Sequence, residues 1–298
     1  MASPAGVLYG AASAGGACSQ SAAGCGLVYE LAPPAAAGEA WTFAVLPGGD
    51  GEGPYGPLLQ SSDGNLYGTT EFGGQGVCSS DDGVVGCGTV FELSPPQPPA
   101  ENWMERVLYS FTGQNGDGAN PTGSLAIDAN GALYGTTYTA GGSPNCQPLW
   151  GGESPGCGTV FQLAPPSAPG GAWTETVLYA FAGVSKATGT ADGALPLGGA
   201  AVDPNGTVYG TTLYGGNGGC AKFADFPPGC GTVFAIAPPL APGGTWVESI
   251  LHQFSGFDGA YPYDPVAVGA NGVLYGTTQG GRSKAGTQYG TAFQIVLQ

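Results

Sequence analysis

Short apolar runs, each closed by Gly, Pro or Asn, follow one another along the whole chain. One run spans residues 107–111 (Val-Leu-Tyr-Ser-Phe), and another recurs as (Leu/Val)-Tyr-Gly-Thr-Thr. Runs this short that are rich in aromatic and β-branched residues predict strands. The 58 Gly and 26 Pro among 298 residues support this, because long helices could not absorb them. Since 42% of the residues are hydrophobic, the chain can bury a core, and we expect an all-β fold.

Five copies of one unit account for the chain. A full copy begins with (Leu/Val)-Tyr-Gly-Thr-Thr, followed in chain order by a Gly-rich loop, Gly-Thr-Val-Phe and a Pro-Pro turn. A Trp then opens a third apolar run, which leads to an Asp-Gly-x-x-Pro loop and a short strand ending in an Asn-Gly turn. Four antiparallel strands that recur at this spacing are typical of a propeller blade, whereas a β-sandwich does not predict repetition. We expect one domain over residues 1–298, a five-bladed β-propeller of four-stranded antiparallel blades. Its repeat units begin near residues 7, 57, 123, 198 and 265.

The terminal blades are expected to be incomplete. We name the strands of a unit a (before the Asn-Gly turn), b (Tyr-Gly-Thr-Thr), c (Gly-Thr-Val-Phe) and d (after the Trp). Strands b and c occur five times but a and d only four, so the first blade lacks its innermost strand and the last an outer one. Proteins normally cover such open edges. Either a segment is missing, or a degenerate strand within residues 1–6 fills the first edge, or a neighbouring subunit adds a strand and builds a ring or filament.

These motifs, in this order, resemble the GloVer (Gloeobacter/Verrucomicrobia-type) tandem repeat of bacterial extracellular proteins. The resemblance covers essentially the whole chain and implies a secreted or surface-anchored β-propeller. It brings no catalytic residues that could be carried over to this sequence. The first copy departs from the pattern with Ala11-Ala12 in place of Thr-Thr, and the fifth has Tyr289 in place of the second Cys. The a-turn-b part resembles the NHL-type propeller unit more weakly.

Eight cysteines form four neighbouring pairs, one in the Gly-rich loop of each of the first four copies. Their spacings vary and the chain has a single histidine, so zinc knuckles fit poorly, whereas a disulfide tolerates such variation. We expect four loop disulfides, with a metal or free thiols as the alternative, and hence an oxidising compartment outside the cytoplasm. The pairs are Cys18 and Cys25, Cys78 and Cys87, Cys146 and Cys157, and Cys220 and Cys230.

The charge excludes some partners. With 21 acidic and 5 basic residues the net charge is −16, which excludes a nucleic-acid binder that works through a basic surface and disfavours anionic membranes. No apolar run approaches the roughly 18 residues needed to cross a bilayer. The first residues contain no basic segment followed by an apolar stretch, so we expect no signal peptide within them.

In a propeller the b-to-c and d-to-a loops emerge on one face, which makes that face the candidate binding surface. The aspartates of the Asp-Gly-x-x-Pro loops should form a partial ring there, either as turn-capping residues or, as the alternative, as a calcium site. No other cofactor is expected. These aspartates are Asp50, Asp117, Asp192 and Asp258.

Two Cys loops carry aromatic residues beside carboxylates, without counterparts in other copies. Trp150 and Glu153 lie in one loop, and Phe223, Asp225 and Phe226 lie in the other. Exposed aromatic residues beside carboxylates suit recognition of a glycan or a protein. Packing within the loop is the alternative.

Catalytic constellations are scarce. His252 occupies the strand-d position of Tyr109 and Tyr179, which favours a core or surface histidine over a member of a Ser-His-Asp triad. Six other acidic residues recur in equivalent turns or strands, which favours structural roles for them. We expect a structural or binding module that is not an enzyme and that associates with itself or with a glycan or protein. The alternative is a carbohydrate-active hydrolase or lyase. The recurring acidic residues are Asp63, Asp128 and Asp203 in the hairpin turns, and Glu105, Glu175 and Glu248 in strand d.

Overall fold

The computed structural model describes most of the chain and contains only β-structure. Named strands β1 to β26 pair antiparallel, and no helix occurs among the described residues, so none there could cross a membrane. The all-β prediction is confirmed. The residues outside the description are 4, 17–23, 37, 48–50, 77, 79–84, 99–100, 147–155, 169, 186–189, 218, 221–227, 242, 282–288 and 298.

Five sheets carry the fold, one for each copy of the repeat, and each has its strands in the expected order. Sheets 2, 3 and 4 have four strands (a-b-c-d), whereas sheets 1 and 5 have three. Sheet 1 contains β1 (Leu8–Ala12), β2 (Leu27–Ala32) and β3 (Thr42–Leu46); sheet 2 contains β5 (Leu59–Gln60), β6 (Leu66–Thr70), β8 (Thr89–Ser94) and β9 (Met104–Ser110); sheet 3 contains β11 (Ala126–Ile127), β12 (Leu133–Thr137), β14 (Thr159–Ala164) and β15 (Thr174–Ala180); sheet 4 contains β19 (Ala201–Val202), β20 (Val208–Thr212), β22 (Thr232–Ala237) and β23 (Val247–Gln253); and sheet 5 contains β24 (Ala267–Val268), β25 (Val273–Thr278) and β26 (Thr291–Val296).

Two-stranded ribbons join three of the Asp-Gly loops to the end of strand b in the following sheet. They fix each d-to-a loop against the neighbouring b-to-c loop, which is the juxtaposition expected from the repeat. These ribbons are β4 (Gly51–Glu52) with β7 (Phe72–Gly73), β10 (Gly118–Ala119) with β13 (Thr139–Ala140), and β18 (Gly193–Ala194) with β21 (Tyr214–Gly215); a fourth, β16 (Val184–Ser185) with β17 (Thr190–Ala191), lies within a single loop.

Two contacts explain the Tyr-Gly-Thr-Thr phrase of strand b. In sheet 2 the hydroxyl groups of Thr70 and Thr89 lie 2.8 Å apart and join strands b and c, and the same distance recurs in sheets 3, 4 and 5. Gly68 lies beneath the Phe91 ring, so a Cβ at this position would overlap that ring. Strand b can therefore carry only Gly where strand c carries Phe.

The Asn-Gly turn between strands a and b is held by an aspartate. The Oδ1 atom of Asp128 accepts hydrogen bonds from the backbone N–H groups of Asn130 (2.8 Å) and Ala132 (2.9 Å). Its Oδ2 atom accepts one from the Tyr134 hydroxyl at 3.1 Å, and Gly131 adopts a φ of 81°. Asp203 accepts the same three hydrogen bonds in sheet 4, which gives both acids a structural role, whereas in sheet 2 Ser61 occupies this position and Asp63 lies two residues further along the turn.

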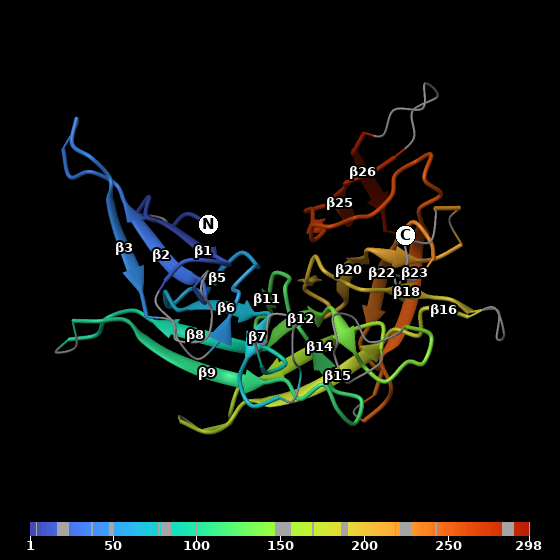
Figure 1. Cartoon of the computed structure of the whole chain (residues 1–298), viewed down its shortest axis with the longest axis horizontal. Coiled ribbons are helices and arrows are strands. Elements are labelled where there is room, and N and C mark those ends of the chain that lie inside the picture. The colour runs from blue at the N-terminus through green and yellow to red at the C-terminus, as the bar shows by residue number, and fades with distance from the viewer. Residues whose placement is uncertain are drawn as a thin grey trace.

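Neighbouring sheets pack face to face around a common centre (Figure 1). Val90 and Leu108 of sheet 2 share a buried cluster with Leu133 and Phe161 of sheet 3. At the centre, the backbone of Ser124 in sheet 3 bridges Gly199 in sheet 4. Each inner sheet thus buries one face against the preceding sheet and the other against the next.

The first and last sheets form the two ends of this fan, coloured blue and red in Figure 1. Every residue of strand b in sheet 3 (β12) is buried, whereas only Leu274 and Thr278 are buried in the equivalent β25 of sheet 5. Each end sheet therefore leaves one face uncovered among the described residues.

The expected gap at the start of sheet 1 is filled. Ala2 forms a bridge with Leu8, and the backbones of Met1 and Tyr9 exchange hydrogen bonds of 2.8 and 2.9 Å. This pairing has the same spacing as Leu59 with Tyr67 in sheet 2. The first residues thus form the degenerate strand a that the sequence analysis allowed. In sheet 5, by contrast, no strand d pairs with β26 in the described part of the chain.

Candidate functional site

The cysteines of the Gly-rich loops form disulfides within their own loops. Three expected pairs are present, Cys78–Cys87, Cys146–Cys157 and Cys220–Cys230, with S–S distances of 2.07, 1.97 and 2.11 Å. Cys25 is also disulfide-bonded, while its expected partner Cys18 lies outside the described residues. The prediction of loop disulfides is confirmed for the three complete pairs.

The aspartates of the Asp-Gly loops bind their own loops. The Oδ2 atom of Asp117 accepts hydrogen bonds from the Thr112 backbone N–H (2.7 Å) and hydroxyl (2.7 Å) and from the Tyr109 hydroxyl (3.2 Å). Asp192 accepts equivalent bonds from the Ala182 N–H and the Tyr179 hydroxyl. These contacts support the turn-capping interpretation. In the ranges described, no three His, Cys, Asp or Glu side chains are close enough to hold a metal ion, and Asp50 lies outside them.

A glutamate from the next sheet approaches each of these two aspartates. Burial, with a smaller contribution from Asp117, raises the pKa of Glu175 to about 7. Burial and then Asp192 likewise raise the pKa of Glu248 to about 7. The Oε1 atom of each glutamate is buried without a hydrogen-bond partner. Strand d of one sheet therefore places a carboxyl group beside the Asp-Gly loop of the preceding sheet.

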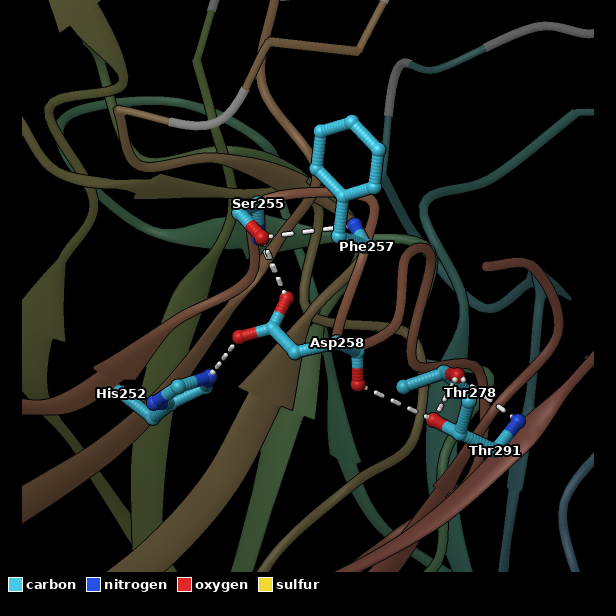
Figure 2. Close-up of polar contacts among 6 residues, drawn as sticks. All are labelled: His252, Ser255, Phe257, Asp258, Thr278 and Thr291. Carbon is cyan, nitrogen blue, oxygen red and sulfur yellow. Dashed lines mark hydrogen bonds and ion pairs between the residues drawn. The ribbon is translucent and has the colours of Figure 1, made fainter. Parts of the chain in front are cut away.

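The third copy of this arrangement differs in composition and in exposure (Figure 2). His252 replaces the tyrosine, and its Nε2 atom lies 2.9 Å from Asp258 Oδ2. The Ser255 backbone N–H (2.8 Å) and hydroxyl (2.7 Å) donate to Asp258 Oδ1. The side chains of His252 and Asp258 are 40% and 45% exposed, whereas Asp192 is buried. In the other two copies, strand d of the following sheet covers the aspartate. The sheet that follows here is sheet 5, which has no strand d among the described residues.

Hydrogen bonds decide the ionisation of Asp258. Burial alone raises the pKa of this carboxyl group, but hydrogen bonds from Ser255 and His252 outweigh burial and leave the pKa below its ordinary value. Asp258 therefore ionises more readily than a free aspartate, and its carboxylate lies in hydrogen-bond contact with the His252 ring.

The geometry does not suit a Ser-His-Asp triad. A triad needs the histidine between the serine and the aspartate, so that it can take the hydroxyl proton. Here Asp258 lies between the two, and the Ser255 hydroxyl donates to Asp258 while its Oγ atom accepts from the Phe257 N–H. Ser255 is therefore a turn residue.

Two buried acids, Glu71 and Glu52, escaped the sequence analysis. Glu71 is 9% exposed, and burial raises its pKa to about 7. The other copies have Ser13, Tyr138, Leu213 and Gln279 at its position, so the signal was an acidic residue where the repeat has none. Glu52, also 9% exposed, lies on the paired ribbon strand β4 and replaces an alanine of the other copies.

The loop residues expected to bind a glycan or protein remain predictions. Each of them lies outside the described residues, so the structure does not place them near the other groups. They are Trp150, Glu153, Phe223, Asp225 and Phe226.

The tryptophans that open strand d link consecutive sheets. Trp103 lies edge-on to Tyr9 of sheet 1, with ring centroids 5.8 Å apart, and Trp173 lies 6.4 Å from Tyr67 of sheet 2. The exception is Trp41 of sheet 1, which is 49% exposed. At the opposite end of the fan, Tyr275 of sheet 5 is 48% exposed.

Comparison with known proteins places the chain in a family. The family model of the Gloeobacter/Verrucomicrobia repeat matches residues 1–293. No curated protein matches the chain. The match spans all five sheets and the motifs that build them, and the chain therefore belongs to the Gloeobacter/Verrucomicrobia repeat family.

Proposed function

We propose that this protein is a secreted or cell-surface module of five β-propeller blades, open between the first and the last blade, that acts as a structural and binding module and assembles through these terminal blades. Three features support the propeller: strands in the order a-b-c-d from the centre outward, face-to-face packing of consecutive sheets, and fivefold repetition of one unit. Disulfides in the loops support an oxidising compartment outside the cytoplasm.

The apolar faces of the two terminal sheets carry the proposal of assembly. Trp41, Phe43 and Val45 on sheet 1 are 49%, 56% and 58% exposed. Tyr275 and Val296 on sheet 5 are 48% and 64% exposed. Trp41 and Tyr275 occupy the positions of the Trp and Tyr that pack together between inner sheets. The two faces are thus the unmatched halves of one recurring contact, and a head-to-tail arrangement of two chains would join them.

Sedimentation velocity over a wide range of protein concentration tests this assembly. We expect the wild-type protein to associate as concentration rises, and the double variant Trp41→Ala/Phe43→Ala to associate at least about tenfold more weakly, because burying such side chains contributes roughly 1.5–3 kcal/mol each. Met104→Ala is the matched control, since Met104 is 67% exposed but lies on an inner sheet. A monomeric wild-type protein at every concentration, or equal association of the double variant, would overturn the proposal.

A carbohydrate-active hydrolase or lyase is the second candidate, favoured by Glu52 and Glu71. Both are buried, both lack acidic counterparts in other copies, and they lie on or beside paired ribbon strands. A carboxyl group with a pKa of about 7, as burial gives Glu71, suits a general acid. Polysaccharide cleavage that Glu71→Gln abolishes would establish this activity, and absence of cleavage of any acidic or neutral polysaccharide would exclude it.

A further inference from the structure

We propose that the outer edge of sheet 5 binds an extended segment of another polypeptide, with the strand-d pattern Trp-x-Glu-x-(Val/Ile)-Leu-aromatic-x-Phe. The segment would pair with β26 by strand addition. This goes beyond assembly through the faces of the terminal sheets, because it uses a backbone edge.

The backbone of β26 presents three donors to this edge. Two N–H groups of the chain at β26 point inward, toward β25. The Thr291 N–H donates to the Thr278 hydroxyl oxygen at 3.2 Å, and the Leu297 N–H donates to the Gly272 carbonyl oxygen. Because successive residues of a strand point their polar groups to opposite sides, the N–H groups of Ala292, Gln294 and Val296 point outward. This is an edge of a kind that proteins normally pair or cover.

Three filled sheets define the chemistry of the occupant. Strand d pairs with strand c over six residues in sheets 2, 3 and 4, with the same register shift in each. The Phe that ends strand d donates its N–H to the carbonyl of the Gly before strand c at 3.0 Å in all three sheets. Gly290 is that glycine in sheet 5. The strands that fill this position are Met104–Ser110, Thr174–Ala180 and Val247–Gln253.

The side chains around the edge are exposed where the filled copies are covered. Leu108 and Leu178 of strand d are 7% and 6% exposed, while the equivalent Leu251 is only partly buried. Asp192 is 8% exposed, whereas the Asp258 side chain is 45% exposed. An added strand d would cover these groups.

The glutamate of the pattern would meet different neighbours at sheet 5. In the filled copies the strand-d glutamate faces an aspartate and a tyrosine, and burial together with that aspartate raises its pKa. At sheet 5 the tyrosine is replaced by His252, hydrogen-bonded to Asp258 (Figure 2). A glutamate of an added strand d would therefore face an imidazole and a carboxylate, where the filled copies present a phenol and a carboxylate.

Fluorescence anisotropy with a labelled peptide of residues 172–181 tests the proposal on the intact protein. We expect saturable binding of this peptide and no binding of a scrambled peptide. Gln294→Pro removes the central outward donor and should weaken binding at least about fivefold, whereas Gln294→Ala retains that N–H and should bind normally. Equal binding of the scrambled peptide, or none of the native one, would overturn the proposal.

Residue-resolved hydrogen exchange distinguishes a lost site from a damaged fold. Bound peptide should protect the amides of Ala292, Gln294 and Val296, and protection confined to other residues would refute strand addition. Peptide binding should survive in Trp41→Ala/Phe43→Ala, while Gln294→Pro should sediment like the wild-type protein. Strand addition and assembly through the terminal faces can therefore fail independently.

Discussion

Replacing Glu71 with glutamine should stabilise the protein in a pH-dependent way. Glu71 is buried, and burial raises its pKa from 4.5 to about 7. The folded state therefore holds the proton more tightly than the unfolded state does. The destabilisation is absent below about pH 4.5, grows as the pH rises, and is complete once the pH exceeds the folded-state pKa.

The size of the effect follows from the shift. One pKa unit corresponds to about 1.4 kcal/mol, so the shift of Glu71 amounts to about 3 kcal/mol of unfolding free energy. Glutamine has nearly the same shape and cannot ionise. We expect Glu71→Gln to unfold like the wild-type protein near pH 4.5 and to be up to about 3 kcal/mol more stable near pH 8.

Urea unfolding with the disulfides intact, measured at several pH values, gives the difference in unfolding free energy between variant and wild type. The difference must be taken at each pH, because Glu175 and Glu248 also have raised pKa values and change the wild-type stability over the same range. Glu101→Gln at an exposed site is the control and should give a difference that does not change with pH. If the difference in unfolding free energy between Glu71→Gln and wild type also does not change with pH, ionised Glu71 is solvated and the reasoning from burial is wrong.

Three further predictions concern the repeat architecture. Replacing Cys78 and Cys87 together with serine should lower the unfolding free energy in urea by about 2–3 kcal/mol, and an unchanged value would contradict a stabilising loop disulfide. Gly68→Ala should lower the melting temperature, with a cost of about 1–3 kcal/mol, because its Cβ overlaps the Phe91 ring; an unchanged melting temperature would refute that overlap. EDTA should leave the melting temperature unchanged, because the loop aspartates are satisfied by their own loops; a large drop would indicate a structural cation.

Local patterns predicted the parts of the fold that depend on neighbouring residues. The Asp128 turn and the Cys78–Cys87 bridge each join groups close in sequence. Turn chemistry and strand period encode such features directly. The degenerate strand at residues 1–3 was harder to predict, because little of the strand-a pattern remains there and its pairing with β1 decides the matter.

The candidate site was less accessible to prediction. His252 and Asp258 were each identified, but as unrelated residues, and their contact depends on the course of the loop between them. The Gly-rich loop residues expected to bind a ligand, such as Trp150, remain predictions. Glu71 was passed over because its type is ordinary and only its surroundings are unusual.

The sequence by itself determined the repeating unit, the order of its four strands and three cysteine pairs that the structure confirms, because these follow from spacing within one copy. Only the tertiary structure decided which faces stay exposed and which carboxyl groups hold a proton. Glu175 meets Asp117, and Trp173 meets Tyr67, across the boundary between two sheets. Burial and electrostatics depend on such contacts between copies, and a pattern within one copy contains no information about which neighbour is present.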